Sequence, residues 1–268
     1  MTHPTTIDSI DFGRLYRDHL AAADRTPKTA ETWDGRAIDF SRKTLQSRYA
    51  DEFIRRMDLA GARTLLDVGC GPGTICLRLA PRMKHVVALD FSGRMLDQLR
   101  ANARSLGCSN VETLQLAWES DWSAVPACDI VVASRSTLVA DLADALTKLD
   151  EKANRRVYLT SLVGGRMLDP ELAEVIGRDL PSMPDYIYAV NILHRMSIHP
   201  RLDYIEAEGR LDRSAGFDEF RSRVAWAAGD LDEVETRRLR DWFERRCEPQ
   251  RAIGPRRWAF ISWEKPAA

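Results

Sequence analysis

The sequence predicts an α/β fold in which a doubly wound, mostly parallel sheet of seven strands is covered by helices on both faces. Three observations support this fold class. Short, apolar, β-branched runs alternate with helical patterns from residue 64 onwards. The first of these runs leads directly into a glycine-rich turn. The last two runs are suited to pair with each other at one edge of the sheet.

The elements follow in order along the chain. Residues 12–23 and 29–59 are expected to be helical, since Trp33, Ala37 and Phe40 recur at helical spacing. Strands are then expected at 64–69, 85–90, 111–117, 128–134, 155–163, 202–211 and 256–264, and helices at 74–83, 93–107, 142–154, 217–228 and 231–247. These patterns predict a helical cap over residues 1–60 and one α/β domain over residues 61–268.

One segment breaks the alternation. Residues 164–200 contain Pro170, Pro181, Pro184 and Pro200 and resemble none of the strand–helix units around them. We expect a helical insertion here that acts as a lid over the strand ends.

Composition limits the class of protein. The 268 residues carry a formal charge of −1, with 44% apolar and 29% charged residues, which is ordinary for a globular chain. Such a balance provides no long-range attraction for nucleic acid or an anionic membrane. The basic run at 237–246 is interleaved with acids, which favours a solvated helix face. No apolar run of about 18 residues suggests a membrane span, and no signal-peptide pattern begins the sequence.

The cysteines and histidines suggest no metal or disulfide chemistry. The five cysteines are odd in number and include no pair at C-x-x-C spacing, so buried thiols in the reducing cytoplasm are expected. His3, His19 and His85 have no partners at ligand spacing, and we assign no metal site.

The stretch "LLDVGCGPG" at residues 65–73 places three glycines behind the first strand. Bare backbone there allows close approach of a ligand, and the following helix directs free N–H groups towards it. Asp90 ends the next strand, where a carboxylate can accept hydrogen bonds from both ribose hydroxyls. A nucleoside ligand is therefore expected. The third glycine comes too early for the dinucleotide pattern, because Thr74 occupies the sixth place.

Four stretches together resemble motifs I to IV of the class I S-adenosylmethionine-dependent methyltransferases: "LLDVGCGPG", "VVALDFSGRML", "VETLQLAWES" and "CDIVVASRS". The resemblance covers roughly residues 62–163 and extends to a "TWDGRAIDF" helix similar to that of small-molecule members with a methyltransferase domain of type 11 or 25. It implies a Rossmann-like sheet and S-adenosylmethionine as the cofactor, with S-adenosylhomocysteine as the product.

The resemblance also implies roles for individual residues. Asp67 is expected to hold the loop amides and the methionine ammonium, Asp90 to bind the ribose, and Phe91 to pack on the adenine. Where the family usually has an acid that reaches the adenine amino group, this chain has Ala117 followed by Trp118. The full set expected at the cofactor is Asp67, Gly69, Cys70, Gly71, Gly73, Asp90, Phe91, Ser92, Met95, Ala117, Trp118, Ser134, Trp33 and Arg36.

The acceptor is less defined than the cofactor. His194 and Tyr188, within the insertion, are the predicted catalytic residues, with a surface histidine as the alternative reading of His194. A small-molecule acceptor is expected, because the sequence after the fourth strand, "SRST", lacks the motifs of nucleic-acid amino-methyltransferases. An RNA or protein methyltransferase, a non-catalytic cofactor-binding regulatory or assembly protein, and an NAD-dependent dehydrogenase remain the alternatives.

Overall fold

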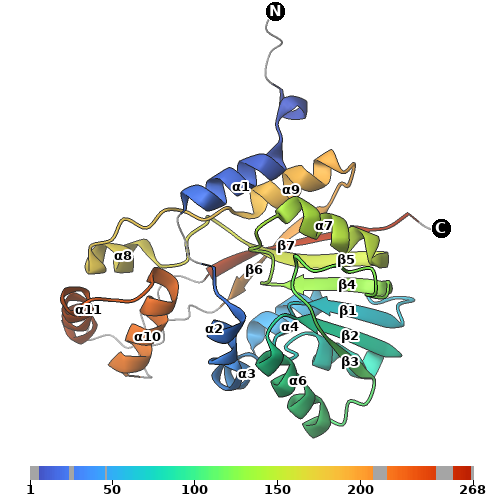
Figure 1. Ribbon diagram of the computed structural model, residues 1–268, viewed down its shortest axis with the longest axis horizontal. Helices are drawn as coiled ribbons and strands as arrows, with labels where there is room; N and C mark the ends of the chain where they lie inside the picture. The colour runs from blue at the N-terminus through green and yellow to red at the C-terminus, as the bar shows by residue number, and fades with distance from the viewer. Residues whose placement is uncertain (1–5, 24–26, 46, 208–215, 246–255, 267–268) are drawn as a thin grey trace, which may run out of the picture.

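A seven-stranded sheet forms the centre of the molecule (Figure 1). The structure, a computed structural model, describes residues 6–23, 27–45, 47–207, 216–245 and 256–266. The strands are β1 (Thr64–Val68), β2 (His85–Asp90), β3 (Val111–Gln115), β4 (Cys128–Ser134), β5 (Ala153–Leu162), β6 (Arg201–Ala207) and β7 (Arg256–Glu264). Their spatial order is β3-β2-β1-β4-β5-β7-β6.

The pairing confirms the predicted fold class. Strands β1 to β5 are mutually parallel, whereas β7 lies antiparallel between β5 and β6. The last two strands of the chain therefore pair with each other, as expected, and complete one edge of a mostly parallel sheet.

Helices cover both faces of the sheet. On one face, α1 (Phe12–Ala22), α7 (Leu142–Glu151) and α9 (Tyr186–Arg195) bury side chains against the strands. On the other face, α4 (Arg48–Arg55), α5 (Cys76–Leu79) and α6 (Gly93–Ser105) do the same. Successive residues of β1 alternate between the two cores, with Leu65 in one and Leu66 in the other, because side chains of a strand point to opposite faces.

The N-terminal segment is helical, as predicted, but it contains breaks that its periodicity does not reveal. Residues 29–59 form α2 (Ala30–Asp34), α3 (Ala37–Thr44) and α4 instead of one run. Gly35 ends α2, and the Ser47 hydroxyl accepts a hydrogen bond from the Ala50 amide to begin α4. Helix α1 packs on one face of the sheet and α4 on the other. Residues 30–44 lie beside α6 and the glycine loop.

Residues 164–200 do not form a single lid. Within them, α8 (Pro170–Ile176) packs with α10 (Phe217–Ala228) and α11 (Glu233–Arg245) in a small core of its own, set to one side of the sheet (Figure 1). Helix α9, by contrast, packs on the sheet beside α1 and α7. The expected helix at 74–83 is also shorter: α5 is followed by the 3-10 turn η2 (Ala80–Arg82), which contains Pro81.

None of the helices that the structure describes is long and apolar enough to cross a bilayer. Four cysteines lie in the described residues, and all four are free thiols, three of them buried. The fifth, Cys247, lies outside the described residues.

Candidate active site

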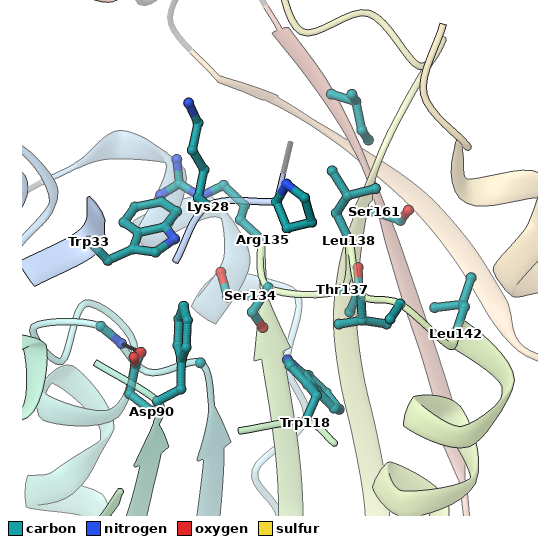
Figure 2. A pocket seen from close by; sticks show the side chains of 18 of the residues that line it. Lys28, Trp33, Asp90, Trp118, Ser134, Arg135, Thr137, Leu138, Leu142 and Ser161 are labelled. Carbon is teal, nitrogen blue, oxygen red and sulfur yellow. Dashed lines mark hydrogen bonds between the residues drawn. The ribbon is translucent and has the colours of Figure 1, made fainter. Parts of the chain in front are cut away.

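A cavity of about 520 Å³ opens at the carboxyl ends of β1, β2 and β4 (Figure 2). Its floor is formed by the glycine loop and by the residues that end or follow these strands. Its roof comes from segments distant in sequence, namely α2, α3, α10 and residues 183–185. Ligands of open α/β sheets bind at this edge, so the position agrees with the sequence prediction.

The three glycines of the loop have different neighbours. Gly69 adopts a φ of +66°, and a Cβ built on it would lie 2.4 Å from the Cβ of Ser136. Gly73 adopts a φ of +93°, and its Cβ would lie 2.5 Å from the Leu77 side chain. At Gly71, with φ +53°, the nearest atom to such a Cβ is on the Phe40 ring at 3.7 Å. Protein packing therefore requires two of the glycines, while Gly71 leaves bare backbone facing the cavity.

Asp90, the last residue of β2, presents a buried carboxylate to the cavity (Figure 2). One oxygen accepts a hydrogen bond from the Gly71 amide at 2.8 Å and the other from the Ser92 amide at 2.9 Å. Burial raises the pKa of this carboxyl, and the two amides oppose the shift. Because each carboxylate oxygen accepts more than one hydrogen bond, both retain capacity for two ligand hydroxyls.

Asp67, in β1, is a second buried carboxyl that lines the cavity, with 1% of its surface exposed. Its Oδ2 accepts a hydrogen bond from the Cys76 amide at 3.1 Å. Burial raises its pKa to about 7. A ligand ammonium beside it would favour the ionised form, so the site fits a group that carries both hydroxyls and an amine.

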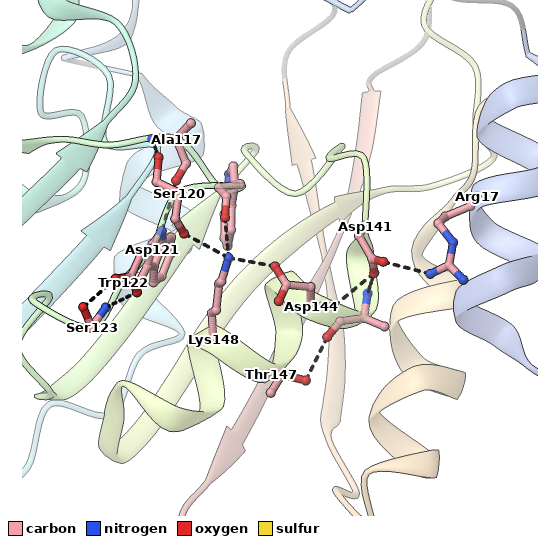
Figure 3. A network of polar contacts seen from close by, with 12 residues as sticks. Arg17, Ala117, Ser120, Asp121, Trp122, Ser123, Asp141, Asp144, Thr147 and Lys148 are labelled. Carbon is pink, nitrogen blue, oxygen red and sulfur yellow. Dashed lines mark hydrogen bonds and ion pairs between the residues drawn. The ribbon is translucent and has the colours of Figure 1, made fainter.

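The loop after β3 forms the adjoining wall. Ala117, Trp118 and Glu119 all line the cavity, and the Trp118 ring stacks on Trp122 with centroids 5.3 Å apart. Lys148 of α7 fixes the loop, because its Nζ donates to the carbonyl of Trp118 at 2.6 Å and pairs with Asp144 (Figure 3). Ala117 replaces the expected acid, and the exposed Glu119, two residues later, is also part of the lining.

The "TWDGRA" segment connects the roof to the floor. Trp33 lines the cavity and contacts Trp226 of α10 edge-on, with centroids 5.1 Å apart. The next residue, Asp34, accepts hydrogen bonds from the Ser92 hydroxyl at 2.5 Å and the Arg94 amide at 3.1 Å. This segment therefore links α10 to the first turn of α6.

Most of the predicted cofactor residues come together in this cavity. The lining includes Trp33, Asp67, Gly69, Cys70, Gly71, Asp90, Phe91, Met95, Ala117, Trp118 and Ser134. Three others lie outside it. Gly73 packs on Leu77, the Ser92 hydroxyl caps α6 by accepting from the Met95 amide, and the Arg36 guanidinium stacks on Trp226 at 4.2 Å.

The two predicted catalytic residues are not among those that line the cavity. His194 is exposed near the end of α9, with its ring 5.8 Å from that of His199. Tyr188 points towards α1, where its hydroxyl lies 2.9 Å from Nδ1 of His19. Asp185, just before α9 in the same insertion, does line the cavity. His194 and Tyr188 therefore have no part in the mechanism below.

Several lining residues lie outside the sequence predictions: Phe40, Glu119, Arg135, Ser136, Trp226 and Trp258. Arg135 and Ser136 directly follow the predicted Ser134, so the end of β4 was the available signal. Trp226 and Trp258 come from α10 and β7, and no local pattern connects them with the glycine loop.

Comparison with known proteins indicates the family of the chain. A family model described as a methyltransferase domain matches residues 65–155. An uncharacterized protein of Haemophilus influenzae is 35% identical over 262 residues, which cover 96% of this chain and 98% of that protein. An uncharacterized RNA methyltransferase of Halalkalibacterium halodurans is 27% identical over 169 residues, covering 60% of this chain but 34% of that relative.

A solved structure shares the fold across most of the chain. Coclaurine N-methyltransferase, crystallised with N-methylheliamine and S-adenosylhomocysteine, superposes with a TM-score of 0.51 at 13% identity, over 97% of this chain and 96% of that one. Together with the motifs and the paired carboxyls of the cavity, these matches show that the chain belongs to the class I S-adenosylmethionine-dependent methyltransferases. It shares a family, over nearly its full length, with the Haemophilus protein.

Proposed function

We propose that this enzyme transfers the methyl group of S-adenosylmethionine to a small-molecule acceptor. The observation that carries the proposal is the roof of the cavity. Trp33 and Trp226 close it from α2 and α10, and residues 183–185 close it from the segment before α9. A volume of about 520 Å³ lies in the range of small-ligand sites, which bury most of a ligand's surface.

Different lining residues would hold different parts of the cofactor. Asp90 would accept from the ribose hydroxyls, Asp67 would face the methionine ammonium, and Phe91 and Trp118 would enclose the adenine. When bound, S-adenosylmethionine supplies an electrophilic methyl carbon: an acceptor lone pair forms the new bond while the carbon–sulfur bond breaks and its electron pair stays on sulfur. Holding the two reactants in line contributes about 7–11 kcal/mol to lowering such a barrier.

Water exclusion and proton removal are the remaining tasks. The tryptophans of the roof keep water from the reacting atoms. Among the described histidines, none belongs to the lining, so the groups able to accept an acceptor proton are carboxylates. Asp185, whose carboxylate also accepts from the Ile187 amide at the start of α9, and Glu119 line the cavity, and either would serve a substrate that must lose a proton.

An RNA acceptor is the second candidate, because several RNA methyltransferases match this chain. Those two matches cover only 34% of each relative. Helix α11, which carries the basic run, packs with α8 and α10 in the separate core rather than along the mouth of the cavity. Its Glu235 also pairs with Arg178.

Incubation with methyl-labelled S-adenosylmethionine and two acceptor pools tests the proposal. One pool is a cell extract filtered to remove macromolecules, and the other is purified total RNA. We expect label in a low-mass product that mass spectrometry then identifies, and none in RNA. The Asp90→Asn variant should lose transfer, while Asp97→Asn, an exposed α6 carboxyl paired with Arg100, should retain it.

Two results would contradict the proposal. Label that enters RNA, with loss of transfer in 0.5 M salt, would establish the nucleic-acid alternative. Tight binding of S-adenosylhomocysteine without transfer into either pool would instead favour the non-catalytic alternative.

A further inference from the structure

Arg135 is a half-buried cation that the cofactor site does not explain. It follows β4 directly and lines the cavity beside Ser134 (Figure 2). Its φ is +58°, a left-handed conformation that non-glycine residues rarely adopt. Such strain persists where surrounding structure enforces it, and it clusters at functional sites. Here the amide of Arg135 donates to the Thr160 hydroxyl at 3.0 Å, which helps to hold the turn.

Aromatic rings, rather than an acid, surround the guanidinium. Its Cζ lies 3.8 Å from the ring centroid of Tyr49 and 5.9 Å from that of Trp258. The Tyr49 hydroxyl is itself fixed by Ser134 and Thr160, at 2.9 and 2.7 Å. The described residues include no carboxylate that forms an ion pair with Arg135.

This arrangement leaves the guanidinium able to bind a ligand. Burial lowers the pKa of Arg135, and the Tyr49 side chain opposes the shift only in part. Part of the side chain nevertheless faces the cavity. A planar guanidinium with free N–H groups matches the two oxygens of a carboxylate.

The two buried acids of the lining and Arg135 come from different strands of the sheet. The buried acids Asp67 and Asp90 belong to β1 and β2, next to the glycine loop. Arg135 follows β4, and its ring partners come from α4 and β7, on the side of β1 away from β2. Lys28 adds a second cation to the lining, with Nζ 4.6 Å from the Trp226 ring centroid.

We propose that Arg135 binds a carboxylate of the methyl acceptor, so that the substrates of this enzyme are small carboxylic acids. The inference rests on the proposed small-molecule function and adds the chemical class of its substrate. Trp258 and Tyr49 hold the guanidinium in place, and the acceptor carboxylate completes its hydrogen bonding. The methionine carboxylate of the cofactor is the other carboxylate that Arg135 could bind. The first arm of the test distinguishes the cofactor carboxylate from the acceptor carboxylate.

The first arm measures cofactor binding by isothermal titration. The probes are S-adenosylhomocysteine and 5′-methylthioadenosine, which lacks the amino-acid portion. Arg135→Met keeps the unbranched stem and removes the charge, Arg135→Lys keeps the charge, and Arg104→Met changes an exposed arginine of α6 as the control. We expect each variant to bind both probes within about threefold of the wild type. A loss of tenfold or more in Arg135→Met for S-adenosylhomocysteine alone would overturn the proposal, because Arg135 would then hold the cofactor.

The second arm measures acceptor recognition with S-adenosylhomocysteine saturating. Benzoate, succinate and citrate are titrated by thermal shift against their uncharged amides. We expect at least one carboxylate to bind the wild type, with tenfold or greater weakening in Arg135→Met and an intermediate value in Arg135→Lys. Equal binding by Arg135→Met, equal binding of the amide, or no binding of any carboxylate to the wild type would overturn it.

Failure of the proposed function can be distinguished from failure of this inference. The proposed function fails if methyl label enters RNA or if no transfer occurs, and the transfer assay is independent of both binding measurements above. Circular dichroism of each variant shows whether a loss of binding reflects a loss of fold. If Arg135→Met does not fold, both binding measurements are made with Arg135→Lys instead.

Discussion

The Asp67 carboxyl gives a pH-dependent stability that can be calculated from its environment. The side chain is 1% exposed, and burial raises its pKa from 3.8 to about 7. Between these values the folded protein keeps a proton that the unfolded chain releases. The free energy of unfolding therefore decreases as the pH rises through this window, and this contribution is constant above it.

The magnitude follows from the shift. At about 1.4 kcal/mol per pKa unit, ionising Asp67 in the folded state costs about 4 kcal/mol, of which about 3 kcal/mol develops between pH 5 and 8. Asp67→Asn removes the ionisable group but keeps an oxygen for the Cys76 amide, whose hydrogen bond to Oδ2 is 3.1 Å long. The variant should therefore gain about 3 kcal/mol relative to the wild type over that range.

Urea unfolding of the ligand-free protein at pH 5, 6, 7 and 8 measures this difference. Because Asp90 and all other groups are present in both proteins, subtracting the two curves largely isolates Asp67. Asp97→Asn, at an exposed carboxyl, should run parallel to the wild type. A difference curve that is flat with pH, or one in which the wild type gains, would refute the buried, unpaired state of Asp67.

Three further substitutions test the site. Gly69→Ala should lower the free energy of unfolding by about 1–3 kcal/mol more than Gly107→Ala does in thermal or urea melts. Both glycines have similar positive φ values, but only Gly69 faces Ser136. Equal losses of unfolding free energy would show that the contact with Ser136 is relieved. Tyr49→Phe should lose about 1–3 kcal/mol of unfolding free energy, since its buried hydroxyl bonds to two side chains; an unchanged urea midpoint would contradict this. Trp118→Ala should weaken S-adenosylhomocysteine binding by about tenfold in titration calorimetry if the ring stacks on the adenine, whereas unchanged affinity would assign it to the loop alone.

The sequence patterns located the strands well. The predicted bounds 85–90, 128–134 and 256–264 coincide with β2, β4 and β7, because short apolar runs flanked by polar or turn residues leave few alternatives. They did not reveal the breaks within 29–59 or the division of 164–200 between two helical clusters. Those features depend on which core each helix joins, which is decided by contacts between distant segments.

In the site, too, residues with a local sequence signal were predicted, and residues placed by contacts between distant segments were not. Asp67, Gly71 and Asp90 belong to contiguous motifs whose residue types state their chemistry, and they line the cavity. Trp226 carries no such local signal, and the motif that contains Arg135 does not state the role of its side chain. Trp226 reaches the cavity through its contact with Trp33, and the burial of Arg135 depends on Tyr49 and Trp258. His194 has residue chemistry suited to a base, but the packing of α9 leaves it exposed.

Calorimetric titration with S-adenosylhomocysteine tests the central claim, that Asp90 and the glycine loop form the cofactor site. We predict binding of one equivalent to the wild type and affinity about tenfold to hundredfold weaker in Asp90→Asn, since a hydrogen bond to a charged group contributes about 1.5–3 kcal/mol. Asp97→Asn should bind as the wild type does. Absence of binding to the folded wild type, or equal affinity in Asp90→Asn, would contradict the account.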